Sequence, residues 1–208
     1  MMLRAFLAIG LGAALAGCSV YREATSPGMD TSLAWRRVAT DADRNKLRDW
    51  RKAWSEALPL ARAADAKRID GDPELFDPDR AQPDALPPAG AYRCRVFKLG
   101  GGGTAVSAIV TYDWRPCLLA DQGKVRHFRI EGGVQRPEGN FFPDVAARAV
   151  FLGTLEVGDD SAPLRYGLDR KRDMIGYGER IGDKRWRLVI PYPAFESKVD
   201  VIEIVPAV

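Results

Sequence analysis

Histidine and cysteine are scarce in this sequence, and neither sign of charge dominates it. The 208 residues contain one histidine and three cysteines, with 31 basic and 28 acidic side chains. One histidine is too few for a histidine-rich zinc site, and a net charge of +3 is too small to indicate a nucleic-acid surface. We therefore expect no metal, no other cofactor and no nucleic-acid partner.

One apolar run stands out at the N-terminus, and it is too short to cross a bilayer as a helix. It covers residues 5–17 and follows a basic start at Arg4, which is typical of a secretory signal peptide. The run ends Leu15-Ala16-Gly17-Cys18, which resembles the lipobox of bacterial lipoproteins. The resemblance implies cleavage before Cys18 and lipid attachment to its thiol, so that residues 18–34 form a tether. The alternative is a plain secretory signal with a chance cysteine, or an uncleaved anchor.

This signal predicts a lipoprotein of the cell envelope that faces the periplasm and meets the membrane through lipidated Cys18. Ser19 follows the cysteine, and by analogy with enteric bacteria a non-acidic residue there favours the outer membrane. In the oxidising periplasm the remaining pair, Cys94 and Cys117, predicts a disulfide. Both cysteines lie in strand-like runs, so we expect the bridge to join neighbouring strands.

Residues 35–69 carry the periodicity of a helix. Thr40 is a suitable N-cap, and Pro59 is expected to kink or split the helix near Leu58. Apolar residues recur at spacings of three and four, at Leu47, Trp50, Trp54, Ala57, Leu58 and Ala61. We expect this face to dock on the main domain. The alternative is that the helix lies on anionic lipid, with a basic flank of Arg44, Arg48, Arg51 and Lys52.

Residues 70–90 are rich in proline and acidic side chains, which predicts a linker or an extended wrap. Asp70, Asp72 and Glu74 resemble part of a calcium loop, but the glycine is in the wrong place for an EF-hand. We therefore favour the interpretation without calcium.

Residues 91–208 form a succession of strand-like segments separated by turns, with no helical pattern between them. The predicted strands are 92–98, 105–112, 117–120, 124–130, 149–157, 174–181, 185–190 and 200–205. A near-continuous meander with short turns closes easily and removes exposed edges, which favours a small antiparallel β-barrel over a sandwich. We predict a mainly β fold (α+β) in which a lipocalin-like or similar barrel carries an N-terminal helical segment packed on it.

Several short motifs occur together along the chain. They are Trp50-Arg51-Lys52-Ala53-Trp54, Tyr92-Arg93-Cys94-Arg95-Val96, Val150-Phe151-Leu152-Gly153-Thr154, Glu179-Arg180-Ile181-Gly182, Arg185-Trp186-Arg187-Leu188-Val189, Phe195-Glu196-Ser197 and Asp200-Val201-Ile202-Glu203-Ile204-Val205-Pro206. With these motifs the chain resembles the bacterial envelope proteins of domain-of-unknown-function family 4893, over roughly residues 35–206. The resemblance implies an envelope location and a single β domain, and it brings no activity or catalytic residue.

Enzymatic chemistry has little support in the sequence. His127 is the only histidine available for a triad, and the alternation around Phe128 places it on the outer face of its strand. Carboxylate catalysis is the remaining option, through Glu179, Glu196, Asp200 or Glu203, although pairing with arginine is their more common role. We assign no catalytic residue and favour a protein that is not an enzyme.

The predicted strand 174–181 indicates where a ligand could sit inside the barrel. Met174, Gly176, Gly178 and Arg180 share one face, and small residues there leave room for a ligand or for a packed neighbour. The ligand-binding candidates are Gly176, Gly178, Glu179, Arg180 and Arg187. We expect a protein that binds a small amphiphile or an envelope protein. The alternatives are a hydrolase of envelope glycan or lipid and a structural scaffold.

Overall fold

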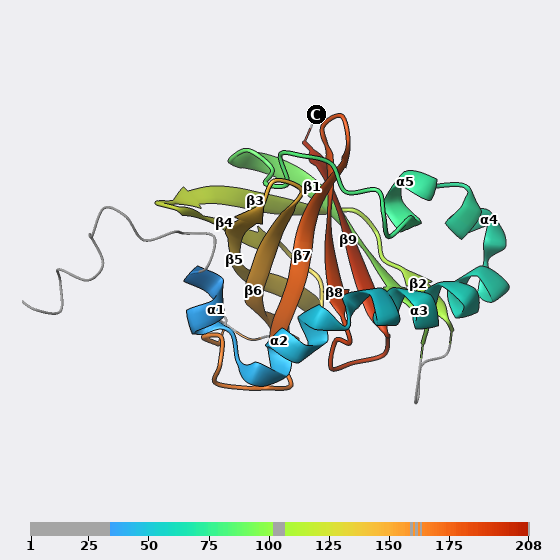
Figure 1. The fold of residues 1–208 in the computed structure, drawn as a ribbon, viewed down its shortest axis with the longest axis horizontal. Coiled ribbons are helices and arrows are strands. Elements are labelled where there is room, and N and C mark those ends of the chain that lie inside the picture. Colours follow the sequence, from blue (N-terminus) through green and yellow to red (C-terminus); the bar gives the residue numbers. More distant parts are fainter. Residues whose placement is uncertain (1–33, 102–106, 159, 161, 163, 208) are drawn as a thin grey trace, which may run out of the picture. The chain divides into compact units, whose positions relative to one another are not determined.

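Strands are the main secondary structure in the part of the chain that the structure describes, and short helices precede them (Figure 1). The structure is a computed structural model that describes residues 34–101, 107–158, 160, 162 and 164–207. The strands are β1 (Gly90–Leu99), β2 (Ile109–Thr111), β3 (Arg115–Gln122), β4 (Val125–Ile130), β5 (Gln135–Val145), β6 (Arg148–Val157), β7 (Asp173–Gly182), β8 (Arg185–Pro191) and β9 (Val199–Pro206). The helices are α1 (Ala34–Val38), α2 (Asp41–Arg48), α3 (Trp50–Ala64), α4 (Ala66–Asp70) and α5 (Pro73–Phe76). The predicted signal peptide, Cys18 and the tether up to residue 33 lie outside the described residues.

Eight of the described strands close into an antiparallel barrel. From β3 to β9 each strand pairs with the next, and β1 pairs with β3 on one side and with β9 on the other. The β1–β9 pairing runs from Tyr92 opposite Pro206 to Leu99 opposite Val199. The short strand β2 pairs with β1 from Phe97 to Leu99, beyond the part of β1 that pairs with β3. The predicted mainly β fold with a barrel is therefore confirmed.

Strand β5 was missed in the sequence because it contains Pro137, Gly139 and Pro143, which are poor strand formers. The structure shows why the two prolines are tolerated. Strand β4 pairs with β5 only between Glu138 and Phe141, so both prolines lie beyond that stretch and pair with β6 alone. The prolines thus occupy positions that resemble those of an edge strand, where a missing N–H costs little.

The barrel wall separates two sets of apolar side chains. Alternate residues point inward and form the interior core, which includes Phe128, Phe151 and Ile202. On the outer faces of β6 to β9 and β1, a second set packs against the helices, with Val201 and Ile175 among the strand residues. Both faces of these strands are therefore buried, which explains the nearly continuous apolar run in β9.

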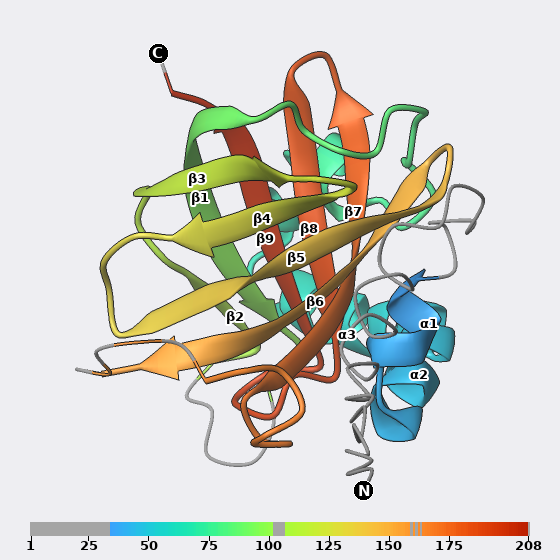
Figure 2. The same ribbon diagram turned by 90° about the vertical axis from the view of Figure 1, so that its left-hand side faces the viewer.

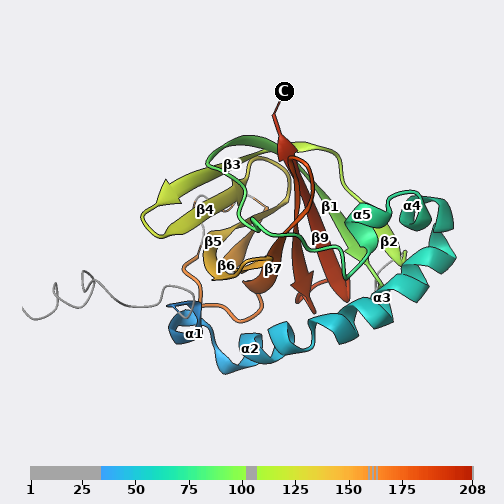
Figure 3. The ribbon, with the colours of Figure 1, turned by 45° about the horizontal axis from the view of Figure 1, so that its top comes forward.

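The helices lie along one side of the barrel, as Figure 3 shows. Trp50 and Trp54 are buried against the strands, so the predicted docking of this face is confirmed, and Thr40 caps α2 by accepting the amide hydrogen of Asp43. None of the described helices has both the length and the apolar composition needed to cross a bilayer.

The expected split at Pro59 is wrong, because α3 continues from Trp50 to Ala64 and the chain breaks at Asp49 instead; a kink at Pro59 stays a prediction. Pro59 and Ser55, whose carbonyl loses its helical donor, are both exposed, so water can satisfy that carbonyl. Buried Trp54 and Ala61, on either side of Pro59, hold the helix to the barrel.

The segment from residue 77 to 89 wraps across one end of the barrel, at the top of Figure 2 in green. Its Ala85 and Leu86 pack into the interior core, and the indole nitrogen of Trp186 donates to the carbonyl of Asp84 at 3.3 Å. Tyr92 donates its hydroxyl hydrogen to the carbonyl of Pro88 at 2.8 Å. We call this end of the barrel the closed end, and the opposite end the open end.

Candidate functional site

A cavity of about 310 Å³ occupies the open end of the barrel interior. Its apolar wall comes from inward-facing residues of six strands, Cys94 and Val96 of β1, Ile130 of β4, Pro137 of β5, Leu155 of β6, Met174 of β7 and Ile202 of β9. Polar and charged residues surround the mouth, among them Tyr112, Asp113 and Arg115. The cavity is thus apolar inside and polar at its entrance.

Side-chain size explains why this cavity lies towards the open end of the barrel. Towards the closed end, the rings of Phe128, Phe141 and Phe151 pack together with centroids 5.2–6.0 Å apart. Tyr92 and Trp186 form an edge-to-face pair nearby, with centroids 6.1 Å apart. The open end carries smaller aliphatic side chains at the equivalent inward positions, so the space between them is not filled.

The predicted disulfide joins β1 to β3 at the edge of the cavity. Cys94 and Cys117 are bonded and both are buried, with their Cα atoms 5.9 Å apart. Cys117 lies opposite Tyr92, so the bridge connects neighbouring strands as expected. The bond fixes β1, which supplies one wall of the cavity and also closes the barrel with β9.

A buried ion pair lies beside the cavity. Nζ of Lys98 is 3.2 Å from Oδ2 of Asp200, and both residues are almost inaccessible to solvent. The side chain of Ser197 also donates to Asp200, whose carboxyl group lines the cavity. Burial raises the pKa of Asp200, while the charge of Lys98 opposes that rise. The cavity wall therefore includes a carboxyl group on whose pKa burial and the charge of Lys98 act in opposite directions.

The predicted ligand-binding glycines of β7 face packed neighbours. A Cβ atom added to Gly178 would lie 2.7 Å from Cε1 of Phe141, and one added to Gly176 would lie 2.9 Å from Cδ1 of Leu188. The space that these glycines leave is therefore used by side chains of the interior core. Neither glycine lines the cavity.

Arg180, the third candidate on this face, lies at the closed end. Its Nη1 is 3.4 Å from a carboxyl oxygen of Asp84, and its carbonyl accepts the amide hydrogen of Gln82 at 2.8 Å. Arg180 thus holds the wrapping segment against the barrel.

The other two candidates, Glu179 and Arg187, form a fully buried ion pair on the outer face, beneath the helices. Arg187 donates from Nε and Nη2 to Oε2 of Glu179, at 2.9 and 2.7 Å, and from Nη1 to the carbonyl of Leu75 in α5. Its guanidinium also lies over the ring of Trp54 in α3. The pair therefore joins the helices to β7 and β8. Ligand binding by these two residues stays a prediction.

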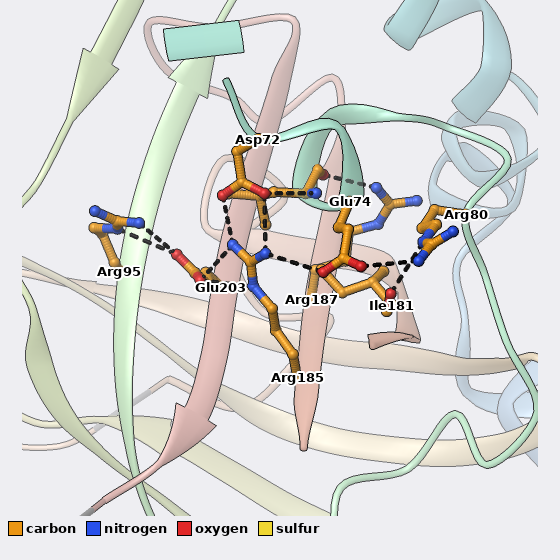
Figure 4. Close-up of polar contacts among 9 residues, drawn as sticks. Asp72, Glu74, Arg80, Arg95, Ile181, Arg185, Arg187 and Glu203 are labelled. Atoms are coloured by element: carbon orange, nitrogen blue, oxygen red, sulfur yellow. Dashed lines mark hydrogen bonds and ion pairs between the residues drawn. The ribbon is translucent and has the colours of Figure 1, made fainter. Parts of the chain in front are cut away.

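A second network of charges covers the neighbouring part of the outer face (Figure 4). Arg185 of β8 donates to both carboxyl oxygens of Asp72 and to Glu203 of β9, which also accepts from Arg95 of β1. Glu74 accepts from Arg80. The acidic residues of the considered calcium loop thus have arginine partners, and no group of three or more metal-binding side chains occurs among the described residues.

The catalytic candidates also have partners. His127 lies on the outer face, with Nε2 3.1 Å from Oε1 of Glu138 and Nδ1 3.3 Å from the side-chain oxygen of Asn140. Of the four acidic candidates, Glu179 and Glu203 pair with arginines, and Asp200 and the exposed Glu196 both lie near Lys98. The hydrolase alternative therefore stays a prediction without a preferred pair.

The residues that define the cavity were not singled out in the sequence as ligand-binding. One signal of the cavity was present in the sequence of β1. Lys98 follows Cys94 and Val96 at a spacing of two residues, so the three side chains had to share the inward face of the strand. A lysine on a buried face needs a charged partner. That partner, Asp200, is 102 residues further along the chain, and the pairing depends on barrel closure.

Fold and site together define a small antiparallel barrel that is blocked at one end and opens at the other on an apolar cavity. The family model described as Domain of unknown function (DUF4893) matches residues 35–204, and the chain belongs to this family. The match extends from α1 into β9, so it includes the helices, the barrel and the cavity. No curated protein and no solved structure matches the chain.

Proposed function

We propose that this protein is a non-enzymatic binding protein of the bacterial cell envelope, and that the cavity at the open end of its barrel holds a small amphiphile. The observation that carries the proposal is the cavity of about 310 Å³ with an apolar wall and a polar mouth. Small-molecule sites have volumes of about 300–1,000 Å³ and combine apolar walls with a few polar groups. The cavity belongs at the small end of that range.

The distribution of side chains sets the orientation of the ligand. A hydrocarbon segment would contact Val96, Leu155, Met174 and Ile202, where burial of apolar surface is favourable. The polar end would remain at the mouth, close to Asp113 and Arg115. An amphiphile fits both regions, whereas a fully polar ligand would leave most of its groups without partners along the apolar wall.

We also propose that Cys18 carries lipid and tethers the protein to the membrane on its periplasmic side, with the outer membrane favoured. The lipobox-like tetrapeptide supports this location, and so does the Cys94–Cys117 disulfide, because disulfides persist in oxidising compartments. Cys18→Ala should release the protein from the membrane into the periplasm. Retention on membranes would contradict the tether.

Ligand binding can be tested with cis-parinaric acid, a fluorescent fatty acid whose emission rises in an apolar site. We expect saturable binding to the full chain and its loss in Leu155→Trp, because the indole would occupy the cavity. The matched control is Leu60→Trp, which places the same side chain on the exposed face of α3 and should bind like the parent protein.

Native mass spectrometry of the same protein adds an independent readout. A reproducible extra mass that denaturation releases, and that Leu155→Trp lacks, would identify the natural ligand. Equal binding of the probe by the parent and by Leu155→Trp would show that the cavity is not the site and would overturn the proposal.

A further inference from the structure

Exposed apolar side chains gather at the open end of the barrel. Six of the nine large apolar residues that are exposed among the described residues lie on β2 or on segments that emerge at this end, namely Val110, Tyr112, Val134, Leu164, Leu168 and Phe195. Leu168 is the most exposed, at 71%, followed by Val134 at 67%. The connections β6–β7 and β8–β9, which carry three of the six, lie at the lower edge of the molecule in Figures 1 and 2.

Basic residues alternate with the apolar ones in the β6–β7 connection. Residues 164–172 include four basic side chains and one acidic side chain. Arg172 pairs with Asp160 and Asp169, whereas Arg165, Arg170 and Lys171 are exposed and form no ion pair with a described residue. Three unpaired positive charges therefore lie beside Leu164 and Leu168.

Hydrogen bonds hold this connection in a defined conformation. The hydroxyl of Tyr166 donates to Asp43 of α2 at 2.6 Å and accepts the amide hydrogen of Thr40 at 3.2 Å. The amide of Gly167 donates to the carboxyl group of Asp173 at 2.8 Å. Tyr166 is thus fixed towards the helices, and Leu164 and Leu168 on either side of it are exposed.

We propose that the open end of the barrel docks on the surface of an anionic lipid bilayer. Leu164, Leu168 and Val134 would enter the headgroup region, and Arg165, Arg170 and Lys171 would face the lipid phosphates. Exposed apolar side chains combined with unpaired basic ones are the features that bind proteins to anionic membrane surfaces. Docking would place the mouth of the cavity against the bilayer. Exchange of an amphiphile between the cavity and the bilayer rests on the proposed function, whereas the docking proposal does not depend on it.

The test measures which end of the full-length protein meets the membrane. A cysteine is introduced at Leu168→Cys or, as the matched control, at Val145→Cys, which is 60% exposed at the closed end. Each variant is labelled with an environment-sensitive fluorophore and reconstituted in vesicles that contain phosphatidylglycerol and a nitroxide-labelled lipid. The parent protein, treated in the same way, gives the background from any other thiol. We expect the nitroxide to quench the Leu168→Cys probe and to leave the Val145→Cys probe bright.

The role of the charges is tested by adding Arg165→Glu, Arg170→Glu and Lys171→Glu to the Leu168→Cys variant, and by vesicles of phosphatidylcholine alone. Quenching should be lost in both cases. Equal quenching of the two probes, no quenching, or quenching that ignores lipid charge would each overturn the proposal. Protection of Leu168→Cys only in the presence of another envelope protein would overturn it in favour of a protein partner. Binding of cis-parinaric acid is measured on the same variants, so a failure of docking is distinguishable from a failure of the cavity to bind amphiphiles.

Discussion

The two ends of the barrel are built from the same strands and differ in what fills them. At the closed end, three phenylalanine rings, a tyrosine–tryptophan pair and the wrapping segment fill the barrel interior. At the open end, smaller side chains leave about 310 Å³ empty, and the surrounding segments expose apolar residues. The comparison teaches that the strand pairing fixes the shape of this barrel, whereas the sizes of its inward side chains decide which end can hold a ligand.

The largest expected effect comes from opening a hole at the closed end. Phe141→Ala should lower the free energy of unfolding by about 3–5 kcal/mol, because the closely packed rings cannot collapse into the space. Met174→Ala, beside the existing cavity, should cost about 2 kcal/mol, since its side chain has fewer neighbours to lose. Denaturant unfolding of both variants gives the two values. Equal losses would show that the two ends are packed alike.

The buried ion pair offers a test of the open end through pH. Lys98→Met should lower the free energy of unfolding by about 3 kcal/mol at neutral pH, because it leaves the Asp200 carboxylate buried without its cation. Burial already raises the pKa of Asp200 above its ordinary value of 3.8, and loss of Lys98 would raise it further. An acid whose pKa is raised in the folded state stabilises the fold below its ordinary pKa and loses that contribution as the pH rises.

The loss in Lys98→Met should therefore shrink as the pH falls towards the ordinary pKa of an aspartate, because protonation of Asp200 removes its unpaired buried charge. Thermal or denaturant unfolding between acid and neutral pH measures the difference. The double variant Lys98→Met/Asp200→Leu is the control, since it removes both charges and should show little pH dependence at this site. A loss that stays constant with pH would contradict the explanation.

The disulfide lies between the two ends and should contribute about as much as the ion pair. Replacing both cysteines, Cys94→Ala with Cys117→Ala, should lower the free energy of unfolding by about 3 kcal/mol, because the unfolded chain gains freedom. Denaturant unfolding under non-reducing conditions measures the loss. The parent protein unfolded with a reductant is the comparison, and it should match the double variant; unchanged stability would contradict the role of the bridge.

The smallest effect is expected at Asp173, at the start of β7 on the outer face. Burial raises the pKa of Asp173, and one of its carboxyl oxygens has no hydrogen-bond partner among the described residues. The contribution of Asp173 to stability is thus greatest below its ordinary pKa and falls as the pH rises. Asp173→Asn keeps an oxygen for the amide of Gly167 and removes the charge, so it should stabilise the protein by up to about 1 kcal/mol at neutral pH. The gain should vanish in acid, and a loss at every pH would contradict this account.

The general architecture could be predicted because it depends on local patterns. Alternation in β1, β6 and β9, with frequent turns, favoured a closed antiparallel barrel, and two cysteines left after Cys18 favoured a disulfide. Strand β5 was missed because the influence of its prolines depends on how far β4 extends, which only the folded barrel defines. The continuous helix at Pro59 has the same kind of cause, since the buried residues around it outweigh its low helix propensity.

The candidate site was harder to predict than the fold. Gly176 and Gly178 suggested space inside the barrel, but that space is used by Leu188 of the neighbouring strand β8 and by Phe141 of β5, which does not pair with β7. The cavity instead arises where several strands each contribute a medium-sized side chain. Its volume depends on all of these side chains together, so no single sequence motif predicts it. Long-range charge pairs such as Arg185 with Asp72 are equally invisible before the chain is folded.

The pairing of β1 with β9 also determines the order in which the protein can fold. Every other pairing within the barrel joins strands that follow one another along the chain, with only the short β2 between β1 and β3, so those pairings can form as soon as both strands are available. The ring closes only when residues 199–206 reach residues 92–99, which makes closure the one step that needs a contact across the whole β region. Until then, two unpaired strand edges are exposed and can pair with other chains. A chain without β9 keeps both edges unpaired, and we therefore expect it to aggregate more readily than the full chain.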